Sequence, residues 1–124
     1  MRILLTNDDG VSAPGIAILA RNLAHWQARG TESDPREVLI VAPMTNMSGM
    51  SSAVTDIYEH PEIAFRRHTI EGAENIPTFA IDGPPALCAI LGAIGTFSPK
   101  PDFVLSGINA GSNVGTSILH SGTV

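Results

Sequence analysis

Short apolar runs alternate with helical patterns along this chain, and this alternation limits the fold more than any other feature. The runs suited to buried strands are Ile3–Thr6, Val38–Val41, Thr78–Ile81 and Phe103–Leu105. The patterns suited to helices are the apolar spacing of Ile16, Leu19, Ala20 and Leu23, and the segment Ala86–Ile94. Such alternation predicts an α/β fold with a mostly parallel, doubly wound sheet. We expect a single domain spanning residues 1–124.

Local signals add detail to this outline. Ser12-Ala13-Pro14 predicts the start of the first helix, with a hydroxyl near the cap and proline in the first turn. Gly30–Pro35 is a polar surface turn, and Trp26 is expected to close the first helix against the sheet. The segment Ala53–His68 is compatible with a pair of strands that turns near His60-Pro61.

Three polar, irregular segments each follow a predicted strand. They are Asn7–Gly10, Met44–Ser52 and Ser106–Gly115. Ligands of doubly wound sheets bind outside the carboxyl ends of the strands, which meet at one edge. We therefore expect the three segments to converge on one site.

The first of these segments carries two adjacent carboxylates, Asp8 and Asp9, directly after a buried strand. Like charges in a desolvated place repel each other, and a hard divalent cation with oxygen ligands would neutralise them. The sequence Asn-Asp-Gly also favours an Asx turn or a helix cap without any ligand. The sequence leaves both interpretations open.

The other two segments offer further polar groups. Gly107–Gly115 repeats glycine every four residues, which suits an anion-binding nest or a merely flexible loop. Asn109 offers a carbonyl or an amide, while Ser48 and Gly49 offer a hydroxyl and a backbone donor in an otherwise solvated loop. Neither the P-loop nor the dinucleotide fingerprint is present. Among the histidines, His120 alone adjoins a candidate site.

Composition excludes several classes of function. A net charge of −5 argues against binding a nucleic-acid polymer or an anionic membrane. A small phosphorylated substrate remains compatible, because a bound cation reverses the local field. The single cysteine, Cys88, is expected in the core. With no apolar stretch near the ~20 residues of a membrane span and no signal-peptide pattern, we expect a cytoplasmic protein.

Five motifs in this order resemble the SurE family. They are Ile3–Gly10, Val41-Ala-Pro43 with Ser48-Gly49, Gly83–Ala86, Leu105–Gly115 and His120–Val124. The resemblance implies a Rossmann-like, three-layer α/β/α fold. It also implies a divalent-metal-dependent nucleotidase or acid phosphatase that hydrolyses nucleoside 5′- or 3′-monophosphates, and in some members polyphosphate. Members of the family form dimers or tetramers.

The resemblance also implies a set of site residues. It implies one Mg²⁺ or Mn²⁺ ion per subunit, held by Asp8, Asp9, Ser48 and Asn109. Asp8 and Asp9 are accordingly the expected catalytic pair. The expected phosphate and substrate contacts are Asn7, Gly49, Ser106, Gly107, Asn113 and Ser121.

The chain departs from the family pattern at four positions and in length. The departures are Met44 for an acid, Ser52 for a histidine, Leu87 for an acid and Ser117 for an aspartate. Family members are considerably longer, so we expect a truncated N-terminal portion. A non-catalytic remnant that binds metal or phosphate is therefore the alternative function. A phosphoacceptor receiver domain is disfavoured, because Asp82 and Lys100 are poorly placed for it.

Overall fold

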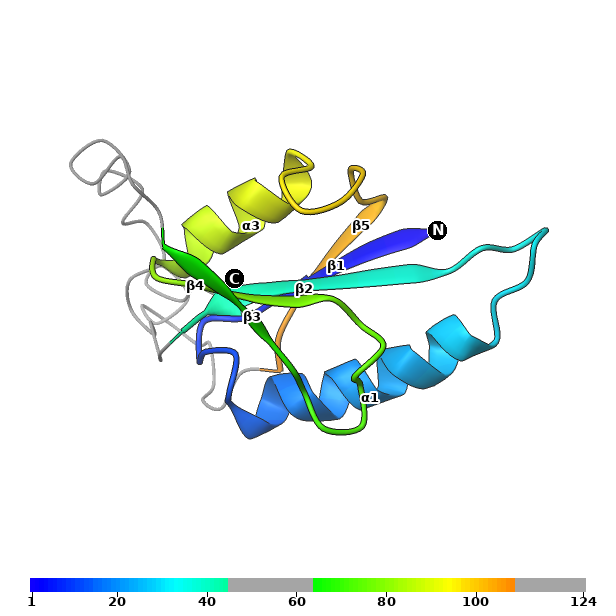
Figure 1. The fold of residues 1–124 in the computed structure, drawn as a ribbon, viewed down its shortest axis with the longest axis horizontal. Coiled ribbons are helices and arrows are strands. Elements are labelled where there is room, and N and C mark those ends of the chain that lie inside the picture. The colour runs from blue at the N-terminus through cyan, green and yellow to red at the C-terminus, as the bar shows by residue number, and fades with distance from the viewer. Residues whose placement is uncertain (45–63, 109–124) are drawn as a thin grey trace, which may run out of the picture.

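The computed structural model describes residues 1–44 and 64–108 of the chain. The strands are β1 (Arg2–Thr6), β2 (Glu37–Pro43), β3 (Phe65–His68), β4 (Thr78–Ile81) and β5 (Phe103–Ser106), and the helices are α1 (Pro14–Ala28) and α3 (Pro85–Ala93) (Figure 1). They form one five-stranded sheet in the order β3-β4-β2-β1-β5. Its pairings are parallel except for the antiparallel β3–β4 pair. The predicted α/β fold with a mostly parallel sheet is confirmed.

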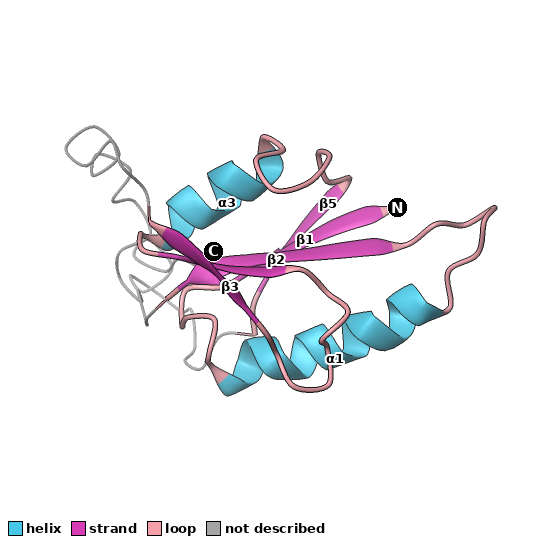
Figure 2. Ribbon diagram, viewed as in Figure 1, coloured by secondary structure: helices cyan, strands magenta, loops and turns pink. Residues whose placement is uncertain are grey.

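The two helices lie on opposite faces of the sheet, so the domain has three layers (Figure 2). Each face of the sheet has its own apolar cluster. On the α1 side the cluster includes Ile3, Leu5, Ile16, Ala20, Leu23, Val38 and Ile40. On the α3 side it includes Leu4, Leu39, Val41, Ile81, Leu87 and Cys88.

Strand β1 lies between β2 and β5 and is buried on both faces. Leu5 packs on the α1 side and Leu4 on the α3 side, because successive side chains of a strand point to opposite faces. This explains why β1 is a continuous apolar run rather than an alternating one. At Gly92, α3 comes so close that an added Cβ would lie 2.6 Å from Leu4 Cδ1.

Proline rather than serine marks where α1 begins. The N-cap residue is Ala13, no side chain caps the helix, and Pro14 occupies the first turn. The expected cap from the Ser12 hydroxyl is therefore wrong. Proline suffices because its fixed φ suits the first turn and its missing N–H is one that needs no partner there. Neither α1 nor α3, the helices of the described segments, is long and apolar enough to cross a membrane.

The connection from β3 to β4 reaches across to α1 (Figure 1). Ile70 and Ile76 are buried in the α1-side cluster, and Arg21 Nε of α1 donates to the Glu71 carbonyl oxygen at 2.9 Å. The strand pair expected within Ala53–His68 is described only at β3, which pairs with β4. Its remaining part, with the turn near His60-Pro61, lies outside the described residues.

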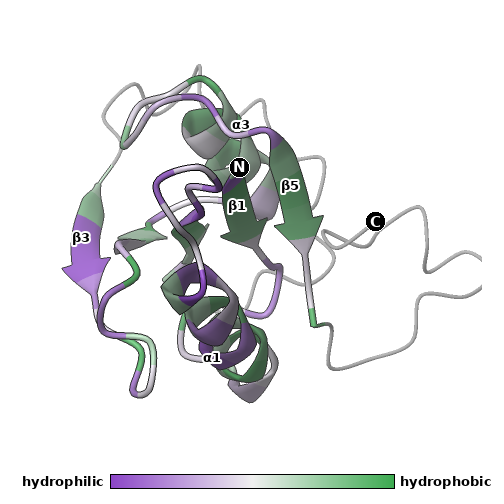
Figure 3. Ribbon diagram, turned by 90° about the vertical axis from the view of Figure 1, so that its right-hand side faces the viewer, coloured by the Kyte–Doolittle hydropathy of each residue, from purple (hydrophilic) through white to green (hydrophobic). Residues whose placement is uncertain are grey.

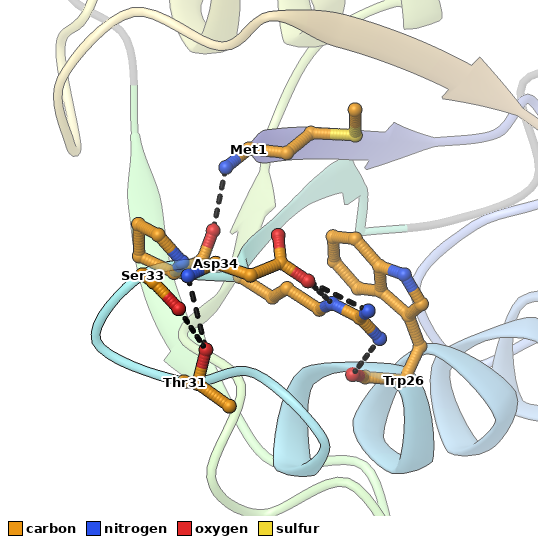
Figure 4. A network of polar contacts seen from close by, with 7 residues as sticks. Met1, Trp26, Thr31, Ser33 and Asp34 are labelled. Atoms are coloured by element: carbon orange, nitrogen blue, oxygen red, sulfur yellow. Dashed lines mark hydrogen bonds and ion pairs between the residues drawn. The ribbon is translucent and has the colours of Figure 1, made fainter.

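The polar turn after α1 is tied to the start of β2 at the edge where the strands begin (Figure 4). The Arg36 guanidinium lies 5.2 Å from the Trp26 ring centroid and donates to the Trp26 carbonyl oxygen at 3.1 Å. It also donates twice to Asp34 Oδ2, at 3.0 and 2.8 Å. The Met1 ammonium group donates to the Pro35 carbonyl oxygen. These contacts hold the end of α1 against the sheet, as expected of Trp26.

We predict that native Cys88 resists thiol reagents. Burial raises the pKa of its thiol to about 12, so almost none of the reactive thiolate is present at about pH 8. A chromogenic disulfide reagent should therefore react rapidly in denaturant and very slowly in buffer. The unfolded chain is the matched control, since this is the single cysteine. Equal rates in both conditions would contradict the packing of α3.

Candidate functional site

The turn that follows β1 is closed by Asn7. Its side chain is fully buried and bonds the Gly10 backbone twice: Nδ2 donates to the carbonyl oxygen at 2.8 Å, and Oδ1 accepts from the N–H at 3.2 Å. Gly10 has φ +103°, which glycine adopts at little cost. The backbone therefore changes direction directly after the strand.

The two carboxylates lie inside this turn. Asp8 is only 2% exposed and Asp9 is half-buried. The Asn7 side chain supplies two hydrogen bonds that close the turn around these carboxylates. The structure thus contains a turn closed by an asparagine side chain, bonded three residues on rather than two as in an Asx turn, and, in the same four residues, two acidic groups at the end of a buried strand.

Hydrogen bonds bring the starts of the three segments together at the carboxyl edge of the sheet. Val11 N–H donates to the Pro43 carbonyl oxygen at 2.7 Å, which joins the first segment to the end of β2. Gly107 N–H donates to the Thr6 carbonyl oxygen at 3.0 Å, which joins the end of β1 to the third segment. Ser106 is the register partner of Thr6. The ends of β2, β1 and β5, after which the three segments begin, are therefore neighbours, while most of the second and third segments lies outside the described residues.

Helix α1 contacts the third segment through Gly15. A Cβ at this position would collide with the Ile108 carbonyl oxygen, and Ile108 Cβ lies 3.3 Å from the same point. Glycine is therefore required here by the close approach of two backbones. This contact places Ile108, the residue before Asn109, against the first turn of the helix.

Thr6 carries the one buried side-chain polar atom that has no hydrogen-bond partner within residues 1–44 and 64–108. The residue is almost fully buried, and its Oγ1 accepts and donates nothing there. An unpaired buried hydroxyl costs about 1–3 kcal/mol. Thr6 immediately precedes the Asn7–Gly10 turn, so this unused hydrogen-bonding capacity lies beside the acid pair.

These donors fit a hard divalent cation. Asp8, Asp9 and the Thr6 hydroxyl are all oxygen donors, the type that Mg²⁺ and Mn²⁺ prefer. The described residues contain no group of three or more His, Cys, Asp or Glu able to hold a metal. Of the four expected ligands, only Asp8 and Asp9 are residues of these types. The other two are the hydroxyl of Ser48 and the side-chain oxygen of Asn109.

Five expected site residues lie outside the described segments. They are Ser48, Gly49, Asn109, Asn113 and Ser121. Of the four departures from the family pattern, Met44 and Leu87 are described. Met44 packs against the α1-side cluster. Leu87 is buried on the α3 side and packs over Gly83, where an added Cβ would lie 2.7 Å from its Cδ2. Apolar contacts thus occupy both places where the resemblance led us to expect an acid.

Sequence analysis did not single out Thr6 or Gly15. Thr6 closes the first apolar run, a position typical of a strand end, and nothing in the sequence shows that its hydroxyl is unpaired. Gly15 follows Pro14 in the helix, where its lower helix propensity was the available signal. The reason for glycine there is a contact with Ile108, which is distant in sequence.

Comparison with known proteins assigns a family to this arrangement. The model of the family described as Survival protein SurE matches residues 3–124. The chain belongs to the SurE family. The 5′-nucleotidase SurE of Azotobacter vinelandii is 42% identical over 125 residues. The 5′/3′-nucleotidase SurE of Edwardsiella ictaluri is 43% identical over 124 residues.

A solved SurE structure matches as well. The SurE protein from Aquifex aeolicus superposes with a TM-score of 0.68 at 37% identity, over 99% of this chain and 43% of that chain. The two nucleotidases are likewise matched over 100% of this chain but 43% and 42% of their own lengths. The chain therefore spans less than half the length of the SurE relatives it matches.

We predict that Gly15→Ala destabilises the protein. Helix propensity alone would favour alanine by about 1 kcal/mol, but the new methyl group would displace the Ile108 carbonyl oxygen. Urea unfolding should show a lower midpoint, and the amides of residues 106–108 should exchange faster. Ile18→Ala, at an exposed position of α1, is the control and should be nearly neutral. A gain in stability from Gly15→Ala would show that the close approach does not exist.

We predict that Thr6→Val stabilises the protein in the presence of a chelator. Valine keeps the shape and removes the unpaired hydroxyl, which should raise the free energy of unfolding by about 1 kcal/mol. Thr78→Val is the matched control, because its buried hydroxyl donates to the Ile76 carbonyl oxygen at 3.1 Å and its loss should destabilise. If urea unfolding showed that both variants change the free energy of unfolding in the same direction, the Thr6 hydroxyl could not be called unpaired in contrast to that of Thr78.

Proposed function

We propose that this chain carries the metal and phosphate site of a nucleotidase, a phosphomonoester hydrolase that acts on nucleoside 5′- or 3′-monophosphates. Polyphosphate is a further proposed substrate. The site would lie at the carboxyl edge of the sheet and use one Mg²⁺ or Mn²⁺ ion per subunit. A cytoplasmic location and a dimeric or tetrameric assembly remain predictions.

One observation carries this proposal: the acid pair follows the interior strand β1 at the point where the chain segments after β2 and β5 also begin. The hydrogen bonds Val11–Pro43 and Gly107–Thr6 keep these segment starts together. Two carboxylates at such a place are suitable ligands for a divalent cation, and a cation there would in turn attract a phosphate dianion. The names of the relatives agree with this chemistry.

We assign the cation to Asp8 and Asp9, with Ser48 and Asn109 as the remaining ligands. When bound, the cation would polarise a phosphate oxygen and lower the pKa of an attacking water. Asp8 is almost fully buried, so its carboxylate would meet the cation where water screens their attraction little. Asn7 shapes the loop, because its side chain bonds the Gly10 backbone.

The phosphate contacts are assigned to the glycine-containing segments. Gly107 has φ +149°, a conformation open to glycine, and follows Ser106 at the end of β5. The Gly107 N–H is already donated to the Thr6 carbonyl oxygen, so the backbone donors proposed for phosphate are other N–H groups of the glycine-containing segments, which bind anions without a side chain in the way. Gly49, Asn113 and Ser121 complete the proposed set. These groups would hold phosphate oxygens while water attacks and the nucleoside leaves.

A second candidate is a non-catalytic protein that binds the metal or phosphate without turnover. The observation favouring it is that the chain spans less than half the length of its relatives. Metal-dependent thermal stabilisation without phosphate release would distinguish it from the enzyme.

We predict that Mn²⁺-dependent phosphate release from nucleoside monophosphates is abolished by Asp9→Asn. The amide is isosteric but neutral, so the site loses one of its two negative ligands. The assay is colorimetric phosphate release, with chelator as the zero-metal reference. The same substitution should lower the thermal stabilisation that Mn²⁺ gives, a readout that does not depend on turnover.

The matched control is Glu32→Gln, which removes one negative charge in the exposed turn between α1 and β2, before the start of β2. It should leave both readouts unchanged. Equal phosphate release by the parent chain and Asp9→Asn would rule out the proposed site. Metal-dependent stabilisation of the parent without release would favour the binding protein.

A further inference from the structure

Thr6 ends β1 with its side chain on the α3 side of the sheet. Successive residues of a strand point to opposite faces, and Leu4, two positions earlier, packs in the α3-side cluster. In the end-on view β1 lies between the two helices (Figure 3). Thr6 is only 4% exposed. Its hydroxyl therefore lies inside the domain, one step before the turn that carries the acid pair.

The Thr6 hydroxyl differs from the other buried threonine hydroxyl of the sheet. That of Thr78 donates to the Ile76 carbonyl oxygen at 3.1 Å, whereas Thr6 Oγ1 has no partner within residues 1–44 and 64–108. The backbone of Thr6 is itself fixed, because its carbonyl oxygen accepts from Gly107 N–H. A buried polar atom without a protein partner commonly bonds an ordered water or lies beside an ion.

The covalent chain keeps Thr6 close to any cation held by Asp8. Two residues span at most about 7 Å between Cα atoms, and both side chains are almost fully buried. A metal–oxygen bond is about 2.1 Å long and a hydrogen bond between two oxygens about 2.8 Å. One water bound to the cation can therefore join a cation on Asp8 to the Thr6 hydroxyl.

We propose that Thr6 is a positioning residue of this site, whose Oγ1 accepts a hydrogen bond from a water bound to the cation. This inference rests on the cation assigned to Asp8 and Asp9 in the proposed function. Mg²⁺ and Mn²⁺ favour about six oxygen ligands in octahedral geometry, so the four proposed protein ligands leave about two places for water or substrate. A lone pair of such a water points to the cation, so the water donates and Thr6 accepts.

A bound water suits this place better than a direct bond to the cation or to phosphate. The hydroxyl belongs to the strand, whereas Asp8 and Asp9 lie in the turn beyond it. The Gly107 hydrogen bond holds Thr6 back in the sheet, away from the position of a direct ligand. The residue has almost no exposed surface, so a water molecule fits beside it more readily than a phosphate group.

The test measures Mn²⁺ affinity by isothermal titration calorimetry. Thr6→Val keeps the shape of the side chain but removes the acceptor, so it should bind Mn²⁺ roughly tenfold more weakly than the parent chain. Thr6→Ser keeps the hydroxyl and should bind as tightly as the parent. Thr78→Val is the matched control. It removes a buried hydroxyl at the start of β4, away from the carboxyl edge, and should leave the affinity unchanged.

Stability and affinity should move in opposite directions, which a merely structural role would not produce. With chelator present, Thr6→Val should unfold at higher urea than the parent, because it loses an unpaired hydroxyl. Thr6→Ser should unfold at lower urea, because it loses a buried methyl group. A Mn²⁺ affinity that follows stability in both variants would contradict the proposal. Destabilisation of the metal-free chain by Thr6→Val would also contradict it, because the hydroxyl would then have a partner without the cation.

Asp9→Asn separates this inference from the function on which it rests. If the parent binds Mn²⁺ and Asp9→Asn does not, the cation site stands, and an unchanged affinity of Thr6→Val contradicts the role of Thr6 alone. A parent chain that does not bind Mn²⁺ would overturn both the site and this inference.

Two further outcomes would give the hydroxyl a different role and overturn the proposal. Loss of Mn²⁺ binding by Thr6→Val as complete as that by Asp9→Asn would make Thr6 a direct ligand. Unchanged Mn²⁺ affinity with weaker binding of inorganic phosphate to the Mn²⁺-loaded variant would assign the hydroxyl to the substrate.

Discussion

The parallel pairing of β1 with both β2 and β5 is the constraint on which the other features depend. It buries β1 on both faces, which demands the continuous apolar run before Asn7. It also brings the ends of three strands to one edge, so that segments distant in sequence begin within hydrogen-bond reach of one another. Helices α1 and α3 then cover the two faces and hold these ends in place.

The end of β1 combines two requirements that usually oppose each other. A strand buried in the centre of a sheet favours apolar residues, whereas cation and phosphate chemistry needs charge. The chain resolves this within a few residues, because the Asn7 side chain closes a turn that keeps Asp8 buried. The residue just before this turn, Thr6, has a buried hydroxyl without a partner among the described residues.

Much of this architecture was predictable from the sequence, because apolar runs and helical spacing report burial directly. The strand and helix positions and the meeting of the three strand ends at one edge followed from that signal alone. The start of α1 was predicted near the right place but for the wrong reason, since Pro14 marks it without a cap from Ser12. The roles of Thr6 and Gly15 were not predictable, because an unpaired hydroxyl and a close backbone approach arise only from tertiary packing.

The unequal edges of the sheet also bear on aggregation. A filament grows by edge-to-edge strand pairing only if one edge strand of the molecule can pair with the edge strand at its other side. Each added molecule then presents an edge to which the next can bind. Among the described strands, one edge is the apolar β5 and the other presents Arg66 and Arg67. Joining β5 of one molecule to β3 of the next would partly desolvate these cations at every junction. The two edges are therefore poorly matched for head-to-tail growth into a filament.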